Sequence, residues 1–340
     1  MLIKMTLKNA AAEGLSIIVL TCNRRELLRG CMESLFAQED PGIPLEFIVV
    51  DDGSSDGTGD MVRRLTASRP QWNYVCQEHK GIATARNAGI RNSRFTWIAI
   101  VADDYLLPAG YARSIRDFFR DHPEAQIVRF KIVASAGTFF CRVLNAYHEA
   151  SVIRRLTLRN STWNRRGMWQ RSVAEEKITT DHDLEAAGAA VFRAGIFQQI
   201  GGFDESFSRG EDSDFTRRLR AAGIPVHYSP FLHIRHRYDP HLGTALKNVF
   251  AAGRASWRIS AAPEQKPAGV AYILRLGLRS CLAALYWSCW RTWQTAGPAR
   301  FFLYFPVLLL LETSNRSGFF SECVRSRKQT PTACGQRLNP

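Results

Sequence analysis

The stretch Thr96–Pro108, TWIAIVADDYLLP, decides the fold of this 340-residue chain. Its apolar, β-branched run predicts a strand buried on both faces, and the run stops abruptly at Asp103-Asp104. Two adjacent carboxylates repel each other and lose solvation unless a cation lies beside them. Because ligands of open α/β folds bind at the carboxyl edge of the sheet, the pair is a candidate metal anchor. The alternative is a polar turn, with Asp104 capping a helix that begins near Pro108.

Three earlier segments show the same kind of strand, each followed by a helical pattern. The predicted strands cover 15–20, 45–50 and 73–76, and the predicted helices cover 24–38, 58–68 and 82–92. This alternation predicts an α/β fold, a parallel sheet with right-handed crossovers and helices on both faces. Neither the G-x-x-x-x-G-K-[ST] loop nor the G-x-G-x-x-G loop follows the first strand. Nucleotide phosphates would therefore be held by a cation, by arginines, or by both.

The formal net charge of +14 is unevenly distributed along the chain. Residues 241–340 hold 13 Lys and Arg against 3 Asp and Glu, which gives +10 of the total. Such asymmetry indicates an anionic partner, either membrane phospholipid or nucleic acid. Against nucleic acid, the basic residues are not interleaved with aromatics in a recognisable binding module.

Composition and cysteine usage indicate the compartment and the size of the core. With 46% hydrophobic residues the chain can bury a sizeable core, enough for one large α/β domain plus an appendage, or for two domains. The eight cysteines include no C-x-x-C pair, and the N-terminal MLIKMTLKNAAAEG has no apolar segment of signal-peptide length. We therefore expect reduced thiols in a cytoplasmic protein.

Six motifs in order resemble inverting family-2 glycosyltransferases with the GT-A fold, of the bacterial polysaccharide and glycolipid type. They are SIIVLTCNRRELLRGCMESLFAQ, FIVVDDGSSDGT, GIATARNAGI, IAIVADDYLLPAGY, AGAAVFRAGIFQQIGGFDE and RGEDSDFTRRLRAAG. The resemblance covers residues 14–240 and implies a Rossmann-like nucleotide-sugar half, 14–122, and an acceptor half, 123–240. We expect 241–330 to form a basic, apolar, helical appendage that associates with membrane, and 331–340 to form a tail.

The resemblance implies a nucleotide site and a metal site. It puts Thr21, Asn23, Asp52, Arg86 and Asp103 on the nucleotide, with the carboxylate of Asp52 accepting the N3–H of a pyrimidine. Alternatively, Arg86 is a surface arginine on an amphipathic helix, and the acidic cluster around Asp52 is a simple turn.

The metal motif departs from the commonest family pattern. Many members have Asp-x-Asp, whereas this chain has Val101-Ala102-Asp103-Asp104. Asp104 is the expected direct ligand of Mg²⁺ or Mn²⁺, and Asp103 bridges to ribose or to metal-bound water. His236, preferred to His233 after a strand predicted at 226–228, is the third candidate, although a lone His is more often a packing residue.

A second acidic motif lies in the acceptor half. Inversion requires a base opposite the leaving diphosphate, and the resemblance to the Glu-Asp motif gives that role to Asp212, with Glu211 supporting it or binding acceptor. The alternative for this stretch is that Asp214 forms ordinary helix-surface pairs with Arg217 and Arg218.

Two further regions bear on the acceptor and on the membrane. The basic interval 151–171 reads as a lid or acceptor loop in which Trp163 or Trp169 stacks on a sugar, or else as a solvated loop. The segments Val270–Trp293 and Phe301–Leu311 are poor spanning helices, because one carries arginines and the other is short. They fit amphipathic helices in the membrane interface, or alternatively a helical subdomain packed on the first domain.

The expected function is inverting, metal-dependent transfer of a sugar from a nucleoside-diphosphate donor to a lipid-linked or polysaccharide acceptor. UDP is the default donor nucleotide, with dTDP and GDP open, and the place is the inner face of the cell membrane, bound peripherally. The alternatives are an inactive sugar- or nucleotide-binding relative, since the first metal carboxylate is missing, and a basic nucleic-acid-binding protein.

Overall fold

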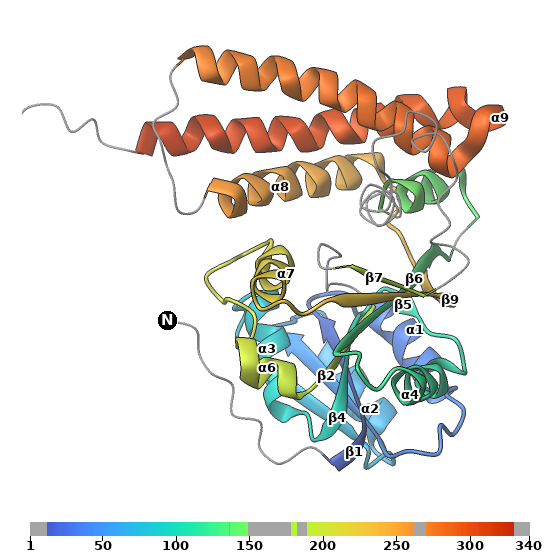
Figure 1. Ribbon diagram of the computed structural model, residues 1–340. Helices are drawn as coiled ribbons and strands as arrows, with labels where there is room; N and C mark the ends of the chain where they lie inside the picture. Colours follow the sequence, from blue (N-terminus) through green and yellow to red (C-terminus); the bar gives the residue numbers. More distant parts are fainter. Residues whose placement is uncertain (1–11, 136, 149–177, 182–188, 262–269, 330–340) are drawn as a thin grey trace, which may run out of the picture. The chain divides into compact units, whose positions relative to one another are not determined.

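The computed structural model describes residues 12–135, 137–148, 178–181, 189–261 and 270–329 (Figure 1). The chain divides into two compact units, Met1–Pro240 and His241–Pro340. The strands of the described residues all belong to the first unit, and the described residues of the second unit are mainly helical.

A mixed sheet forms the centre of the first unit. Its strands are β1 (Ala12–Thr21), β2 (Leu45–Asp52), β3 (Trp72–Gln77), β4 (Phe95–Ala102), β5 (Tyr105–Leu106), β6 (Ile127–Ala134), β7 (Thr179–Asp181), β8 (Ala190–Arg193) and β9 (Val226–His236). The order is β3-β2-β1-β4-β8-β6-β9-β5, and β7 pairs with β9. Strands β1 to β4 pair in parallel, as predicted, whereas β8 runs antiparallel to both β4 and β6.

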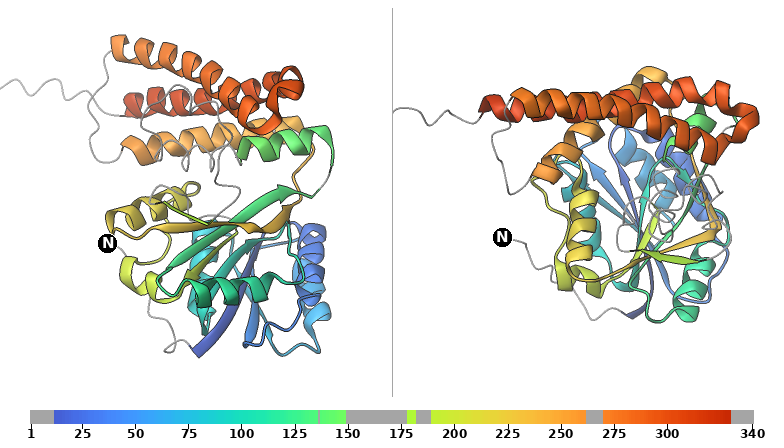
Figure 2. Two further views of the ribbon diagram at one scale, coloured as in Figure 1. Left: turned by 45° about the vertical axis from the view of Figure 1, so that its right-hand side comes forward. Right: turned by 45° about the horizontal axis from the view of Figure 1, so that its top comes forward.

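Helices cover both faces of this sheet, which confirms the predicted α/β class (Figure 2). They are α1 (Arg25–Phe36), α2 (Thr58–Thr66), α3 (Ile82–Asn92), α4 (Tyr111–Asp121), α6 (Gly195–Ile200) and α7 (Glu211–Ala221). Side chains of α1, α2 and α4 pack on one face, and those of α3, α6 and α7 pack on the other. Helix α4 begins at Tyr111 without a side-chain cap, so the alternative in which Asp104 caps it is wrong.

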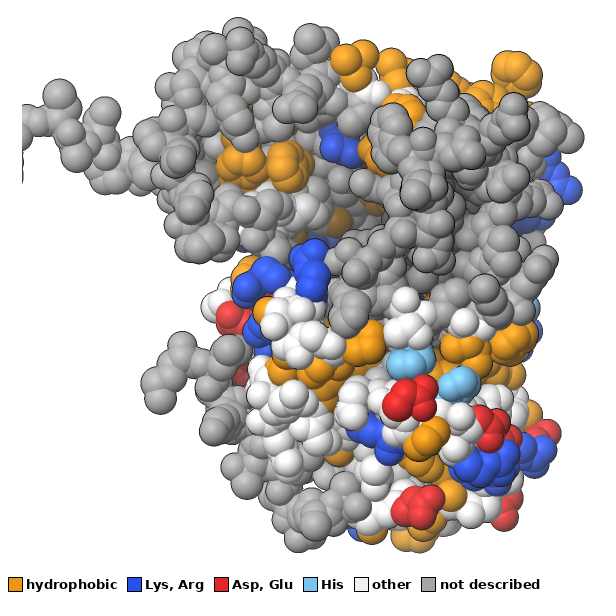
Figure 3. Space-filling view, viewed as in Figure 1, with side chains coloured by type: hydrophobic (Ala, Val, Ile, Leu, Met, Phe, Trp, Pro, Cys, Tyr) orange, Lys and Arg blue, Asp and Glu red, His pale blue; other side chains and the backbone are white. Residues whose placement is uncertain are grey.

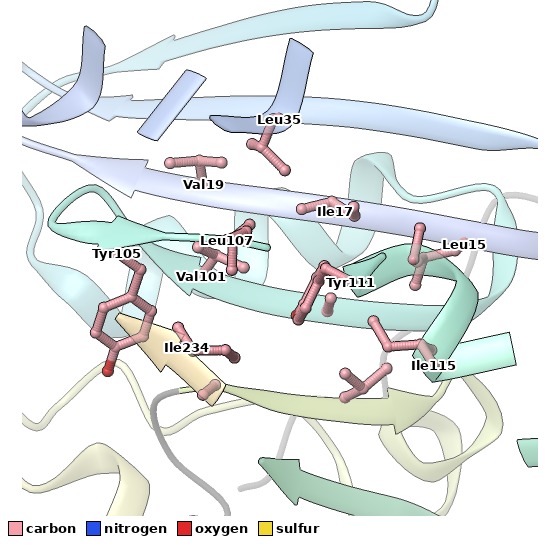
Figure 4. Packing of buried hydrophobic residues seen from close by; sticks show 14 of the residues in the cluster. Leu15, Ile17, Val19, Leu35, Val101, Tyr105, Leu107, Tyr111, Ile115 and Ile234 are labelled. Carbon is pink, nitrogen blue, oxygen red and sulfur yellow. The ribbon is translucent and has the colours of Figure 1, made fainter. Parts of the chain in front are cut away.

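Alternate residues of the central strands enter two separate hydrophobic clusters. On β1, Ile17 and Val19 enter one cluster, whereas Ile18 enters the other. Figure 4 shows the first cluster, which extends past the end of β4 to Tyr105 and to Ile234 of β9. This packing fixes the carboxyl ends of β4 and β9 beside each other.

Strand β9 is longer than the sequence predicted, and this changes the position of both histidines. His233 and His236 lie inside β9 and do not follow a short strand at 226–228. The β6–β9 register shifts between Phe130 and Lys131, where β9 carries Pro230, a residue tolerated in a sheet at such an irregularity. Because side chains alternate along a strand, His236 shares the face of the buried Ile234, and His233 is exposed on the other face.

Two helices, α8 (Leu242–Ala261) and α9 (Val270–Gln329), make up the part of the second unit that the structure describes. In Figures 1 and 2 α9 folds back on itself, so the predicted segments 270–293 and 301–311 belong to one helical element. The helices approach closely at Gly253, where a Cβ would overlap the backbone carbonyl of Asn315. Within the described ranges, no helix has both the length and the apolar character that crossing a membrane requires.

The second unit buries its described carboxylates and exposes apolar side chains. Glu322 accepts hydrogen bonds from Arg254 at 2.7 Å and Arg258 at 2.8 Å, and Glu312 accepts one from Arg316 at 3.0 Å. Figure 3 shows hydrophobic side chains at the surface of this unit. The large exposed ones on α9 are Leu282, Leu285, Tyr286, Phe302, Leu303 and Leu310.

Candidate active site

Several predicted site residues meet at the carboxyl edge of the sheet. The parallel strands β1, β2 and β4 end there with Thr21, Asp52 and the Asp103-Asp104 turn. Strand β6 runs in the same direction, since both it and β4 are antiparallel to β8, and β9 is parallel to β6. The end of β9 therefore brings His236 to this edge as well.

The carboxylates of Asp103 and Asp104 share one arginine. Arg24 approaches Asp103 Oδ1 at 2.6 Å and Asp104 Oδ2 at 2.7 Å. Asp103 Oδ2 also accepts a hydrogen bond from the Thr21 hydroxyl at 2.8 Å. Thr21 at the end of β1 and Arg24 in the loop that follows it thus hold the acidic pair in place.

The two carboxylates differ in their pKa. Burial raises the pKa of Asp103 to about 6; Arg24 opposes this shift and Asp104 adds to it. Burial also acts to raise the pKa of Asp104, but His236 and Arg24 outweigh it and hold this pKa at about 2. Asp104 is therefore ionised at neutral pH in this arrangement.

The residues around Asp104 fit a hard divalent cation. Within the described part of the chain, Asp104 Oδ1 is buried and has no hydrogen-bond partner. The imidazole Nε2 of His236 lies 3.3 Å from Asp104 Oδ2, and Tyr105 packs edge-on against that ring with centroids 5.0 Å apart. Two carboxylates and one imidazole are ligands that Mg²⁺ or Mn²⁺ accepts. These residues could hold the ion; their role as ligands stays a prediction.

Asp51 and Asp52 point in opposite directions. Asp51 accepts hydrogen bonds from the Ser54 N–H and the Tyr74 hydroxyl, whereas Asp52 faces the loop that follows β3. Both oxygens of Asp52 are engaged by Gln77 Nε2 at 2.7 Å, the Lys80 N–H at 2.9 Å, the Gly81 N–H at 2.9 Å and His79 Nδ1 at 2.9 Å. Burial acts to raise the pKa of Asp52, but the hydrogen bonds from Lys80, Gln77 and Gly81 lower it below the ordinary value.

Asn23 links the loops that follow β1 and β2. Its backbone lies in the left-handed region with φ 53°, which asparagine tolerates better than most residues. Its N–H donates to Ser54 Oγ, and its side-chain oxygen accepts the Ser55 N–H, both at 2.8 Å. The position predicted to contact nucleotide therefore holds two loops of the site together.

Arg86 pairs with Glu211 at the start of α7. Its Nη1 lies 2.7 Å from Glu211 Oε1, both side chains are buried, and the guanidinium lies 4.9 Å from the centroid of the Phe203 ring. The neighbouring Asn87 exchanges hydrogen bonds of 2.8 Å with the backbone of Phe203. The surface-arginine alternative is wrong for Arg86, and two motifs separated by more than a hundred residues are joined directly.

The acidic residues of α7 have different surroundings. Asp214 pairs with Arg217 at 2.7 Å and with Arg218 at 2.8 Å, as the alternative reading expected. The second pair is buried, however, because Arg218 also donates to the carbonyls of Ile200 and Gly202. Asp212 is half-buried in the first turn of α7, where the helix dipole favours a carboxylate.

The structure therefore forms two groups of predicted residues. Thr21, Asp103, Asp104 and His236 meet around Arg24, and Arg86 meets Glu211 at the start of α7, the helix that carries Asp212. Trp163 and Trp169 lie outside the described residues.

Sequence reasoning missed three residues of this edge: Arg24, Cys22 and His79. The Cys22 thiol donates to the Asp52 carbonyl at 3.3 Å and lies 3.6 Å from His79 Nδ1. Their positions after predicted strands were the available signal, but nothing in the residue types indicated which group each of them would contact.

A cavity of about 400 Å³ lies elsewhere in the first unit, between the end of α1 and the beginnings of β2 and β3. Its lining includes Phe36, Phe47, Arg69 and Trp72, and none of the predicted site residues. The amino ends of parallel strands are not where open α/β sheets bind ligands, so this cavity is separate from the candidate site.

Comparison with known proteins identifies related chains. The family model described as glycosyl transferase family 2 matches residues 16–198. Validoxylamine A glucosyltransferase of Streptomyces hygroscopicus subsp. limoneus is 28% identical over 229 residues, 62% of this chain and 49% of that protein. Glycosyltransferase GlyA of Streptococcus pneumoniae is 26% identical over 141 residues, 40% of this chain and 20% of that protein. The chain thus spans half or less of the length of these curated relatives.

The fold is similar to that of a solved enzyme. The mannosyltransferase PcManGT from Pyrobaculum calidifontis, solved with GDP-Man and Mn²⁺, matches with a TM-score of 0.53 and 17% identity. The match covers 92% of this chain and 90% of that chain.

Proposed function

The chain belongs to glycosyl transferase family 2 and has the GT-A fold, and from this premise we propose that it is an inverting, metal-dependent glycosyltransferase that uses a nucleotide-sugar donor. The observation that carries the proposal is the arrangement around Asp104. This ionised carboxylate lies between Arg24 and His236, and its second oxygen, buried, has no partner among the described residues. A buried polar atom without a partner is costly unless a ligand completes it.

On the donor side, Asp104, Asp103 and His236 would hold Mg²⁺ or Mn²⁺. When bound, the cation supplies positive charge that neutralises the departing nucleoside diphosphate. Arg24 already brings one positive charge to the same carboxylates. That PcManGT was solved with GDP-Man and Mn²⁺ supports a nucleotide sugar and a divalent cation as the pair of ligands.

We assign recognition of the nucleotide base to Asp52. Thr21 and Asn23 line the same edge of the sheet. The four protein donors of Asp52 already occupy its oxygens, so a pyrimidine N3–H would replace one of them. His79 is the exposed donor of the four, since its side chain is 70% accessible. We assign this replacement to the hydrogen bond from His79. UDP is the default donor nucleotide, and dTDP and GDP are the alternatives.

On the acceptor side, Asp212 is the proposed general base. The acceptor hydroxyl oxygen forms the new bond to the anomeric carbon, the bond to the diphosphate oxygen breaks on the opposite side, and the hydroxyl proton passes to Asp212. Glu211 is fixed by Arg86 and so positions the first turn of α7. Trp163 and Trp169 are proposed as acceptor contacts.

For the acceptor we propose a lipid-linked sugar or a polysaccharide, reached by peripheral contact of α9 with the inner face of the cell membrane. The exposed residues Leu282, Leu285 and Tyr286 have the i, i+3, i+4 spacing of one helix face. The +10 charge of residues 241–340 would favour anionic lipid over nucleic acid, given the apolar surface beside it.

The experiment is a thermal-shift panel of nucleoside diphosphates, with Mn²⁺ and with EDTA, followed by donor hydrolysis under both conditions. A ligand that binds only the native state raises its melting temperature, so one diphosphate should do so with Mn²⁺ and lose most of the effect in EDTA. Binding without hydrolysis would identify an inactive relative. Hydrolysis that is unchanged in EDTA would overturn the metal assignment.

A further inference from the structure

Three possible ligands of a softer metal meet at the carboxyl ends of β1, β2 and β3. They are Cys22 after β1, Asp52 at the end of β2 and His79 after β3, and one ligand atom of each lies within 4.8 Å of the other two. Cys22 is a free thiol. Among the described residues, Cys22, Asp52 and His79 make up the cluster of His, Cys and carboxylate side chains that meets this condition.

The separations are close to those of a tetrahedral site. Zinc bonds of about 2.3 Å to sulfur and about 2.0–2.1 Å to nitrogen and oxygen place tetrahedral ligands about 3.4–3.6 Å apart. Cys22 Sγ and His79 Nδ1 are already 3.6 Å apart. His79 Nδ1 and Asp52 Oδ2 lie at 2.9 Å, so this pair has to open by a few tenths of an ångström.

The surroundings prepare Asp52 for such a role and leave His79 free to adjust. The Asp52 carboxylate is oriented by Gln77 and by the N–H groups of Lys80 and Gly81, the kind of outer contacts that fix metal ligands. His79 carries an exposed side chain, so its ring can move without disturbing the core. Three protein ligands leave a fourth position open to water or to a ligand.

We propose that Cys22, Asp52 and His79 form a binding site for a thiophilic divalent cation of the Zn²⁺ class. The donor set separates it from the site around Asp104, which has two carboxylates and an imidazole but no sulfur. Thiolate favours Zn²⁺, whereas Mg²⁺ and Mn²⁺ favour oxygen ligands. The chain therefore carries two neighbouring cation sites of different selectivity at the edge of one sheet.

Occupation of the second site would inhibit donor binding, a consequence that rests on the proposed function. Asp52 and His79 cannot coordinate zinc and at the same time exchange a hydrogen bond for a nucleotide base. Zinc should therefore compete with the nucleoside diphosphate, although Mn²⁺ should not.

The test of the site itself needs no enzyme activity. The full chain is titrated with Co²⁺ as a spectroscopic substitute and with Zn²⁺ by equilibrium dialysis, and compared with the variants Cys22→Ser and His79→Asn. Cys76→Ser, which changes an exposed free thiol on β3, is the matched control. We expect one zinc per chain and a thiolate-to-cobalt absorption band, both retained in Cys76→Ser.

Each ligand variant should weaken zinc binding at least tenfold and abolish or shift that band. His79→Asn changes an exposed side chain, so its fold is expected to be intact, and its melting temperature without metal checks this. Unchanged zinc affinity in both Cys22→Ser and His79→Asn, or a cobalt spectrum without the thiolate band, would overturn the site.

The competition is measured separately, as the Mn²⁺-dependent thermal shift by the best diphosphate with and without one equivalent of Zn²⁺. Loss of the shift in the parent chain but not in Cys22→Ser supports the overlap with the base site. Zinc binding with an undiminished shift would disprove the overlap. Zinc binding with no diphosphate shift under any condition would instead count against the transferase assignment and leave the metal site standing.

Discussion

Two acidic regions of the first unit, helix α7 and the end of β4, differ in how their carboxylates are paired with arginine. In α7, Glu211 pairs with Arg86 and Asp214 with Arg218, and in each pair both side chains are at most 10% exposed. At the end of β4, two adjacent carboxylates share the single Arg24, whose side chain is 42% exposed. We call the pairs in α7 closed, because carboxylate and arginine are buried together. At the end of β4, by contrast, Asp104 Oδ1 has no hydrogen-bond partner among the described residues, and the exposed Arg24 can move away.

This difference separates a structural from a ligand-binding arrangement. Breaking a buried ion pair leaves an uncompensated charge and costs about 3–5 kcal/mol, so closed pairs act as permanent joints. An incompletely paired carboxylate is kept where a ligand completes it.

The largest effects are expected for Asp104→Ala and Asp212→Asn. For Asp104→Ala, transfer should fall about 10²–10³-fold, the range seen when a group that stabilises transition-state charge is removed, and the Mn²⁺-dependent thermal shift by nucleoside diphosphate should disappear. Asp212→Asn should lose about 10²–10⁴-fold in transfer, as expected for a general base, yet keep the shift. The measurements are initial rates with a radiolabelled donor and melting curves of the same samples.

Asp60→Asn, on the exposed side of α2, serves as the control and should change neither quantity. If Asp104→Ala retained the Mn²⁺-dependent shift, or if Asp212→Asn lost it, the division into a donor and an acceptor carboxylate would be wrong.

The substitution Arg86→Met tests how much a closed pair contributes to the free energy of unfolding. The change leaves Glu211 as a buried carboxylate without its arginine and removes the contact with the Phe203 ring, so unfolding free energy should fall by about 3–5 kcal/mol in urea titrations. The double variant Arg86→Met, Glu211→Leu should recover most of the loss, because the unpaired charge is gone. Equal destabilisation of the single and double variants would show that packing, and not the ion pair, holds α7 to α3.

In the second unit, we expect a smaller and pH-dependent loss of stability when the ion pairs of Glu322 are broken. Burial acts to raise the pKa of Glu322, but the hydrogen bonds from Arg258 and Arg254 hold it below its ordinary value of 4.5. A depressed pKa means that the pair contributes stability above about pH 4.5, and that this contribution is lost as the pH falls through the folded-state pKa.

Glu322→Gln should therefore be less stable than the parent at pH 7, and the difference should narrow below pH 4.5. Melting temperatures from pH 7 to pH 3 measure this. A difference that stays constant over the whole range would mean that Glu322 acts through packing alone.

The smallest effect is expected for Arg24→Gln. Because the arginine of this ion pair is 42% exposed, its removal should cost less stability than breaking the fully buried Arg86–Glu211 pair. Because Arg24 occupies oxygens that a cation would need, calorimetry should find Mn²⁺ bound several-fold more tightly in the variant, with Arg29→Gln on the same helix as control. Weaker Mn²⁺ binding would instead make Arg24 an assistant of the metal and not its competitor.

The first half of the sheet was predictable because each of its elements carries a local signal. The helix 82–92 and the strands ending at Thr21, Asp52 and Ala102 follow from apolar runs and helical spacing, both short-range properties. The antiparallel β8 and the extension of β9 through Pro230 were not predictable in this way. Both depend on pairing with strands far away in the chain, and the shifted register at Lys131 has no local sequence signal.

The sequence by itself determined the identity of the acidic motifs and the strands that deliver them, because burial of a continuous apolar strand dictates where its polar end must emerge. Only the tertiary structure decided which charges meet. It paired Arg86 with Glu211 and placed Arg24 between Asp103 and Asp104. The physical reason is that an ion pair depends on distance in space, whereas sequence patterns report only which side of a strand or helix a residue occupies.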